Sequence, residues 1–141
     1  MDLELLFLIA NGAALVGWLP LFIGLRKIDA ARFARLVAAG LAVGYLILFL
    51  VAGDEARVLA RDYSLRGIGA FFSYPELRLL GWVHYLAFDL FVGSWEADEA
   101  RRAGLPHLLL LPCLVLTFLL GPIGLLAFLL VRAFSRRRTS A

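Results

Sequence analysis

The chain alternates between long apolar runs and short charged connections. Four runs carry almost no charge, and they cover residues 5–25, 36–53, 79–95 and 108–131. An α-helix needs about 20 apolar residues to cross about 30 Å of hydrocarbon. The runs lack the two-residue alternation of membrane strands, so helices are the expected spanning elements. The sequence therefore predicts an all-α, polytopic integral membrane protein with four transmembrane helices in a small bundle.

The domain organisation is predicted to be simple. We expect one four-helix membrane domain over residues 1–134 and a basic, disordered tail over residues 135–141. The first run follows two acids, Asp2 and Glu4, and no small-residue cleavage site comes after it. We therefore interpret it as a true span and not as a secretory signal peptide. The single cysteine, Cys113, falls inside the fourth run, so it predicts neither a disulfide nor a metal site.

Composition and charge support the membrane interpretation. The chain is 62% hydrophobic and 18% charged, whereas soluble domains are about half apolar and about one quarter charged. Four arginines between residues 132 and 138 follow the last run, which predicts an anchor at anionic lipid headgroups and not a nucleic-acid site. With four spans, the side of both termini would carry eight Lys or Arg residues and the other side six. The basic first connection favours termini outside, and the basic tail favours the opposite orientation.

The third run contains the most informative polar residue, Asp89. A carboxylate at the bilayer centre costs about 3 kcal/mol, so it indicates a pairing or functional role. At 100° per residue, one stripe of this helix gathers five residues: Trp82, Tyr85, Asp89, Gly93 and Glu96. His84 falls on a different stripe, so contact between His84 and Asp89 within the helix is not expected.

Partners for Asp89 and His84 must then come from other segments. The candidates are Asn11 in the first run, His107 before the fourth and Thr117 within it, together with arginines at the span ends. Asp89 has two interpretations: a structural carboxyl that hydrogen-bonds a neighbouring helix, or an acid or base facing a lipid-soluble substrate. The two histidines suit acid/base work as well as simple hydrogen bonds to headgroups or backbone. Asn11 is also typical of polar contacts between packed helices.

The fourth run contains helix breakers. Pro112 and the pair Gly121-Pro122 predict two kinks or a broken middle, because proline removes a backbone hydrogen bond. The carbonyls freed in this way need partners or must line a cavity, and Thr117 is one helical turn away. A kinked helix opposite the helix that carries Asp89 could enclose a pocket.

These motifs together resemble a known family. The segments 82–91 (WVHYLAFDLF), 93–96 (GSWE), 104–107 (GLPH) and 112–118 (PCLVLTF), with the block 121–126 (GPIGLL), are similar to the abscisic-acid-deficient-four-like membrane family. The resemblance covers about residues 72–132, and the first two runs match in hydropathy alone. It implies a small four-helix membrane protein. Plant members of the family act in plastids, in making neoxanthin from violaxanthin.

The resemblance also assigns candidate roles. An isomerase-like reaction on a carotenoid needs proton removal and proton delivery, for which Asp89, His84 and His107 are the catalytic candidates. Trp82, Tyr85, Asn11 and Thr117 are the substrate-binding candidates. We expect no cofactor, metal or nucleic acid. The expected partners are membrane lipid, a carotenoid or isoprenoid, and a second copy of the chain.

Other functions stay open at this point. The main alternative is a bundle without enzymatic activity that binds pigment or lipid, or supports assembly of a larger complex. A small transporter or channel has less support, because the runs offer a single intramembrane acid and no internal repeat. The absence of an Arg-rich, Ser-rich leader and the Arg, Ala and Leu bias favour the inner membrane of a bacterium.

Overall fold

The computed structural model describes residues 1–24, 29–58 and 64–139. These residues form six helices and no strand: α1 (Leu3–Ile23), α2 (Ala30–Val58), α3 (Leu65–Phe71), α4 (Pro75–Arg102), α5 (His107–Leu120) and α6 (Pro122–Thr139). The all-helical prediction is confirmed. The basic tail that was expected to be disordered over residues 135–141 lies within α6 as far as Thr139, and residues 140–141 lie outside the described residues.

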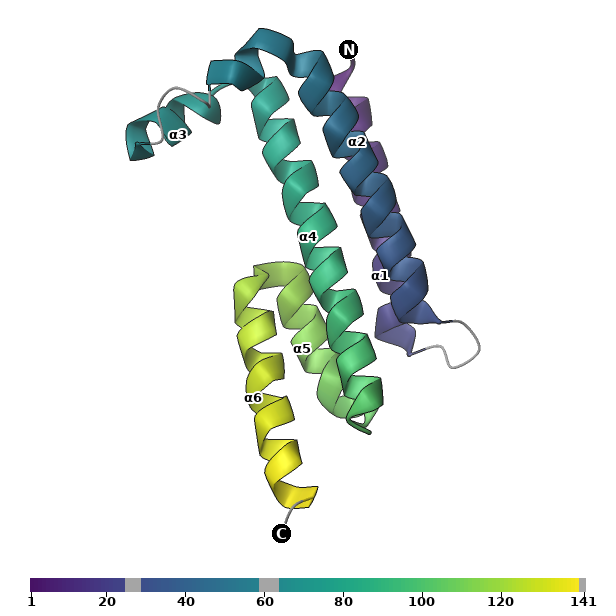
Figure 1. Cartoon of the computed structure of the whole chain (residues 1–141). Helices are drawn as coiled ribbons and strands as arrows, with labels where there is room; N and C mark the ends of the chain where they lie inside the picture. Colours follow the sequence, from purple (N-terminus) through teal and green to yellow (C-terminus); the bar gives the residue numbers. More distant parts are fainter. Residues whose placement is uncertain (25–28, 59–63, 140–141) are drawn as a thin grey trace.

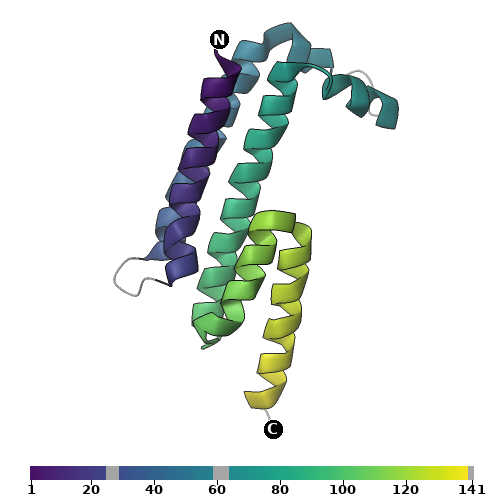
Figure 2. The same ribbon diagram turned by 180° about the vertical axis from the view of Figure 1, so that it is seen from behind.

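The three long helices α1, α2 and α4 lie side by side along most of their length (Figure 1 and Figure 2). Close packing depends on small residues: the Trp18 ring of α1 fills the space where a side chain at Gly93 of α4 would lie. Trp18 is 1% exposed and belongs to the main core cluster. The bundle is therefore held by large side chains set into glycine and alanine surfaces of neighbouring helices.

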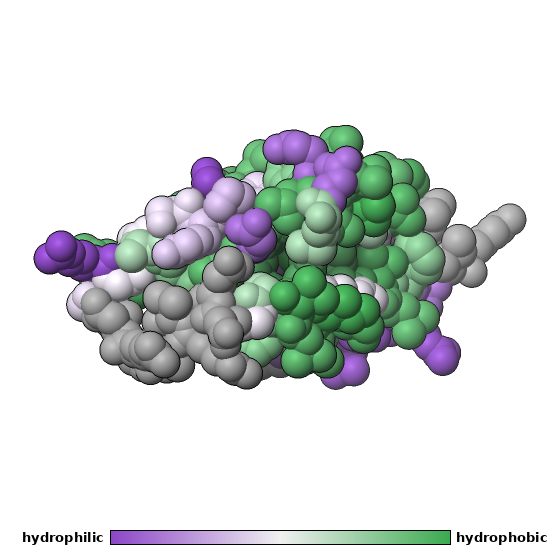
Figure 3. All heavy atoms as spheres, turned by 90° about the horizontal axis from the view of Figure 1, so that it is seen from above, coloured by the Kyte–Doolittle hydropathy of each residue, from purple (hydrophilic) through white to green (hydrophobic). Residues whose placement is uncertain are grey.

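Two helices are long and apolar enough to cross a membrane, Leu3–Ile23 and Ala30–Gly53. Their apolar windows are only 28% and 17% buried, so most of their leucine, isoleucine and valine side chains face outward. In a view from the end that carries the N-terminus, apolar residues form much of the visible surface and polar residues are scattered (Figure 3). Gly53, with φ 53° and ψ −121°, interrupts α2 and separates its apolar part from its charged last turn.

The fourth apolar run differs from the predicted single span. It forms two helices, α5 and α6, which fold back on each other at Gly121 (Figure 1 and Figure 2). Gly121 has φ 51°, a conformation that glycine adopts without a steric penalty. Pro122 follows as the first residue of α6, where its missing N–H costs nothing. The expected broken middle is present, but as a complete reversal of the chain; Pro112 lies within α5 without ending it.

This reversal decides the overall shape. The α5–α6 hairpin lies against only one half of α4, the half near Arg102, and leaves the other half uncovered (Figure 1). The N-terminus and the start of α4 mark one end of the molecule, called here the N-terminal end, and the C-terminus marks the opposite, C-terminal end. The short helix α3 extends sideways at the N-terminal end (Figure 2).

Candidate functional site

A groove occupies the part of α1 and α4 that the hairpin leaves uncovered. Its volume is about 770 Å³. Its walls come from the first turns of α1, the segment before α4 and the first half of α4; the lining residues include Leu3, Phe7, Phe72, Leu79, Trp82 and Tyr85. Glu4 and Arg78 are the charged residues of the lining. The groove thus combines aromatic and aliphatic walls with a small number of polar groups, which is typical of small-molecule sites.

The aromatic wall is built on Trp82. Its ring stacks on that of Tyr85 at 5.3 Å between centroids and lies 5.8 Å from the ring of Phe7. The indole Nε1–H donates to Asn11 Oδ1 at 3.2 Å, and the Asn11 amide in turn donates to the Phe7 carbonyl at 2.7 Å. Asn11 therefore fixes the Trp82 ring across the α1–α4 contact, while 39% of Trp82 stays exposed to the groove.

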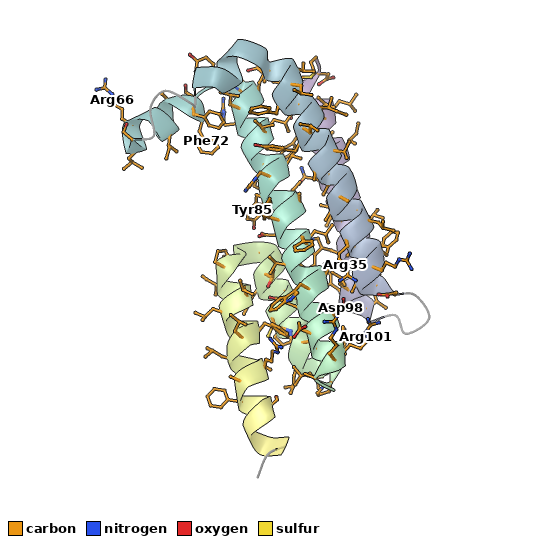
Figure 4. The ribbon with its side chains drawn as sticks, viewed as in Figure 1. Arg35, Arg66, Phe72, Tyr85, Asp98 and Arg101 are labelled. Atoms are coloured by element: carbon orange, nitrogen blue, oxygen red, sulfur yellow. The ribbon has the colours of Figure 1, made fainter. Side chains whose placement is uncertain are left out.

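Phe72 closes the other side of the groove. Its ring lies over Gly81, where an added Cβ would come within 2.6 Å of the Phe72 ring. Phe72 also packs edge to face against the buried Phe71 at 5.1 Å. Phe71 is the last residue of α3 and Phe72 follows it. Figure 4 shows Phe72 near the start of α4, with Tyr85 further along it. A surface glycine on α4 thus makes room for this wall.

Asp89 lies beyond the inner end of the groove, at the tip of the hairpin. The Tyr85 hydroxyl donates to the Phe118 carbonyl at 3.5 Å and also approaches the Asp89 carboxyl. Asp89 Oδ1 is 3.0 Å from the position that a Cβ on Gly121 would occupy. Its Oδ2 is buried and has no hydrogen-bond partner among the described residues. Tyr85 therefore lies between the groove and a buried carboxyl oxygen that has no hydrogen-bond partner among the described residues.

The other catalytic candidates lie elsewhere. His84 faces the α2 side, stacked on Phe88 at 4.4 Å and tilted against Tyr45 at 5.9 Å. This agrees with its predicted position on a different stripe from Asp89. His107 Nε2 is 2.9 Å from the Phe22 carbonyl and packs on Gly24, at the C-terminal end of α1. The structure therefore brings neither histidine to Asp89.

Thr117 lies in a buried polar contact that the sequence reasoning missed. Its Oγ1 is 2.9 Å and 3.0 Å from the two carboxyl oxygens of Glu96, and both residues are 0% exposed. Glu96 shares the stripe of Asp89, which was the available signal, but nothing in the sequence pairs it with Thr117. The contact joins α4 to α5 and stands apart from the groove. Of the four substrate-binding candidates, Trp82 and Tyr85 line the groove, Asn11 hydrogen-bonds Trp82, and Thr117 lies elsewhere.

Ion pairs tie the helices together at the C-terminal end. Asp98 accepts hydrogen bonds from Arg35 of α2 at 2.6 Å and from Arg101 at 2.7 Å, and Figure 4 shows the three residues gathered there. Glu99 pairs with Arg132 of α6. Burial acts to raise the pKa of Asp98, but the hydrogen bond and charge of Arg35, with the charges of two nearby arginines, outweigh it and lower the pKa below its usual value.

Metal ligands do not gather in the described part of the chain, where no group of three or more His, Cys, Asp or Glu side chains could hold an ion. A protein-family model with the description ABA DEFICIENT 4-like matches residues 5–128. The match takes in the first two helices, which the motifs of the third and fourth runs did not reach. No curated protein and no solved structure matches the chain.

Proposed function

Because the chain belongs to the ABA DEFICIENT 4-like family, we propose that it is an integral membrane protein. In this proposal it binds a carotenoid or another isoprenoid in the groove between α1 and α4, and acts on this ligand. We assign it to the inner membrane of a bacterium. The observation that carries the proposal is the aromatic groove itself.

The exposed surface supports a membrane location. A core helix of a soluble protein is mostly buried, whereas only 28% and 17% of the apolar windows of α1 and α2 are buried. Leu8, Leu46 and Leu50 are 64%, 53% and 68% exposed. In water this exposure of apolar surface is unfavourable, whereas contact with lipid would remove the cost. Because α4 lies beside α1 and α2 for most of its length, a membrane around these two helices also surrounds α4.

The shape and chemistry of the groove suit an elongated apolar ligand. Stacked aromatic rings offer a flat surface to a polyene or prenyl chain, and their burial stabilises binding by the hydrophobic effect. Glu4 and Arg78 near the N-terminal end could interact with a hydroxyl or epoxide at one end of the ligand. The other end of the ligand would reach towards Tyr85, next to Asp89.

Asp89 and Tyr85 are the groups that favour a reaction over binding alone. An unpaired carboxyl oxygen beside a phenol can remove and return a proton, which is what isomerisation of an epoxide requires. The rival proposal, a pigment-binding bundle without turnover, is favoured by the distance of both histidines from this place. Both proposals share the groove and differ in the role of Asp89.

The test is to purify the protein in mild detergent from a carotenoid-producing host and identify the extracted pigments by chromatography and mass spectrometry. We expect wild type and the control Phe88→Leu, exposed on another stripe of α4, to retain pigment. Trp82→Leu should retain several-fold less. An Asp89→Asn variant that keeps its pigment but loses a product isomer supports the reaction, and one with unchanged products supports binding alone. Equal pigment in Trp82→Leu and wild type would contradict the groove.

A further inference from the structure

We propose that α5 and α6 form a re-entrant hairpin, which enters the membrane from the C-terminal end, turns at mid-depth and leaves on the same side. The chain then crosses the membrane three times, through α1, α2 and α4. Its N-terminus faces the outside, and its basic C-terminal end lies at the anionic headgroups of the cytoplasmic leaflet. This inference rests on the membrane location proposed above but not on the identity of the ligand.

The apolar part of each arm is too short to cross the bilayer. The 14 residues of α5 extend about 21 Å at 1.5 Å per residue, which is less than the hydrocarbon thickness of about 30 Å. In α6 the apolar segment ends at Val131, and Arg132 reaches Glu99 in the last turns of α4. The start of α5 and the end of the apolar segment of α6 therefore lie at the level where α4 ends.

The tip of the hairpin meets the requirements of a non-helical turn at membrane depth. The Gly121 N–H donates to the Thr117 carbonyl at 2.9 Å, and the Gly121 carbonyl accepts from Gly124 at 3.0 Å and from Leu125 at 3.2 Å. Pro122 has no N–H to satisfy. Gly121 is buried against Asp89 of α4. Irregular backbone is tolerated in the hydrocarbon region where protein covers it in this way.

The outer face of α6 is apolar, as expected for a helix that contacts lipid while it returns to the membrane surface. Ile123, Leu126 and Leu130 are 55%, 58% and 52% exposed. The arginines at 136–138 follow only after this apolar face ends. The same helix thus changes from a lipid-facing to a headgroup-facing composition over its length, as expected for an arm that emerges into an anionic interface.

The hairpin also settles the orientation that charge counting under four spans left undecided. With three crossings, the connections after α1 and α4 share a side with the tail, and the chain places ten of its 14 Lys and Arg residues there. The other side holds four, at positions 57, 61, 66 and 78. The positive-inside rule then assigns the C-terminal end to the cytoplasm. The groove, near the N-terminal end, opens into the outer leaflet.

The test measures the side of each terminus in bacterial cells. A C-terminal green fluorescent protein fusion folds only in the cytoplasm. The N-terminus is read by Asp2→Cys in a Cys113→Ala background, with a membrane-impermeant maleimide on intact spheroplasts, and Ala103→Cys in the same background serves as the matched control on the opposite side. We expect a fluorescent fusion, labelling at position 2 from outside, and labelling at position 103 only in inverted vesicles.

Both termini on one side would overturn the hairpin, and an N-terminus inside with the C-terminus outside would overturn the orientation. Extraction of the membranes with alkaline carbonate comes first. Release of the chain by carbonate would contradict the membrane location itself, and with it the proposed function. A chain that resists extraction but has both termini on one side would contradict the hairpin alone.

Discussion

At the scale of the residue, the contact between Glu96 and Thr117 is the clearest test of buried polar packing. The Thr117 hydroxyl donates a hydrogen bond to the fully buried carboxyl of Glu96. Its removal in Thr117→Val leaves this carboxyl without that partner, so we expect a loss of about 2 kcal/mol in unfolding free energy. Thermal unfolding in detergent, followed by circular dichroism, measures it. Thr117→Ser keeps the hydroxyl and is the control; equal losses in both variants would contradict a specific contribution from this hydrogen bond.

Asp98 predicts a dependence of stability on pH. Its pKa is lowered in the folded protein because the Arg35 hydrogen bond and nearby arginine charges outweigh the effect of burial. A lowered folded pKa means that the carboxylate stabilises the fold above the unfolded pKa, near 3.8, and that this contribution is lost as the pH falls through the folded value. We expect Asp98→Asn to reduce stability at pH 6 and to flatten its decline in acid.

The measurement for Asp98 is the unfolding midpoint in detergent between neutral and acidic pH. Glu4→Gln is the matched control, since Glu4 is an exposed carboxylate at the opposite end of the molecule. The same acid-induced decline in Asp98→Asn and in wild type would contradict the assignment of the effect to this ion pair. Salt should weaken it only modestly, because Asp98 is only 6% exposed.

Sequence reasoning at this scale succeeded within a helix and failed between helices. The helical repeat separated His84 from Asp89, and the structure places them on different sides of α4. It could not pair Asn11 with Trp82 or Glu96 with Thr117, because these partners are 71 and 21 positions apart. Such pairings depend on how helices are packed, and a single sequence does not contain that information.

At the scale of the element, the hairpin depends on close contact between α5 and α6 at Gly124. An added Cβ there would collide with the backbone nitrogen and hydroxyl of Thr117. We expect Gly124→Ala to force the two helices apart and to lower the unfolding free energy by about 3 kcal/mol, at the upper end for overpacking. The unfolding midpoint in detergent measures this loss.

Gly12→Ala is the matched control for Gly124→Ala. Gly12 is also a helical glycine in an apolar helix, but no atom lies within 4 Å of an added Cβ. Alanine there should be neutral or should stabilise α1 by up to about 1 kcal/mol through its helix propensity. Similar losses at both positions would contradict the close approach of α5 and α6.

Hydropathy could predict α1, most of α2 and the apolar part of α4, because each contains one long apolar run. It could not distinguish one 24-residue span over 108–131 from two half-length helices, since both bury the same apolar residues. Gly121-Pro122 signalled a break, but proline breaks are common within true spans. The positive φ of Gly121 and the collision that Gly124 avoids turn a kink into a reversal, and these depend on three-dimensional packing.

At the scale of the whole molecule, the half-length hairpin explains why a groove exists. A full-length fourth span would continue along α4 towards the N-terminal end and cover the surface of α4 beside Trp82. Because the chain reverses at Gly121, the hairpin covers α4 only as far as Asp89. The groove and Asp89 therefore lie on either side of the boundary between the covered and the uncovered part of α4. The groove and the position of the candidate acid thus have one structural cause.

The most direct test of isoprenoid binding in the groove is photo-crosslinking of the wild-type protein in detergent with a diazirine-bearing geranylgeraniol, followed by peptide mass spectrometry. We expect adducts on the groove residues Phe7, Trp82 and Tyr85 that excess unlabelled β-carotene suppresses. Adducts spread evenly over lipid-facing residues such as Leu46 and Leu126, with no suppression by the competitor, would contradict an isoprenoid site in this groove.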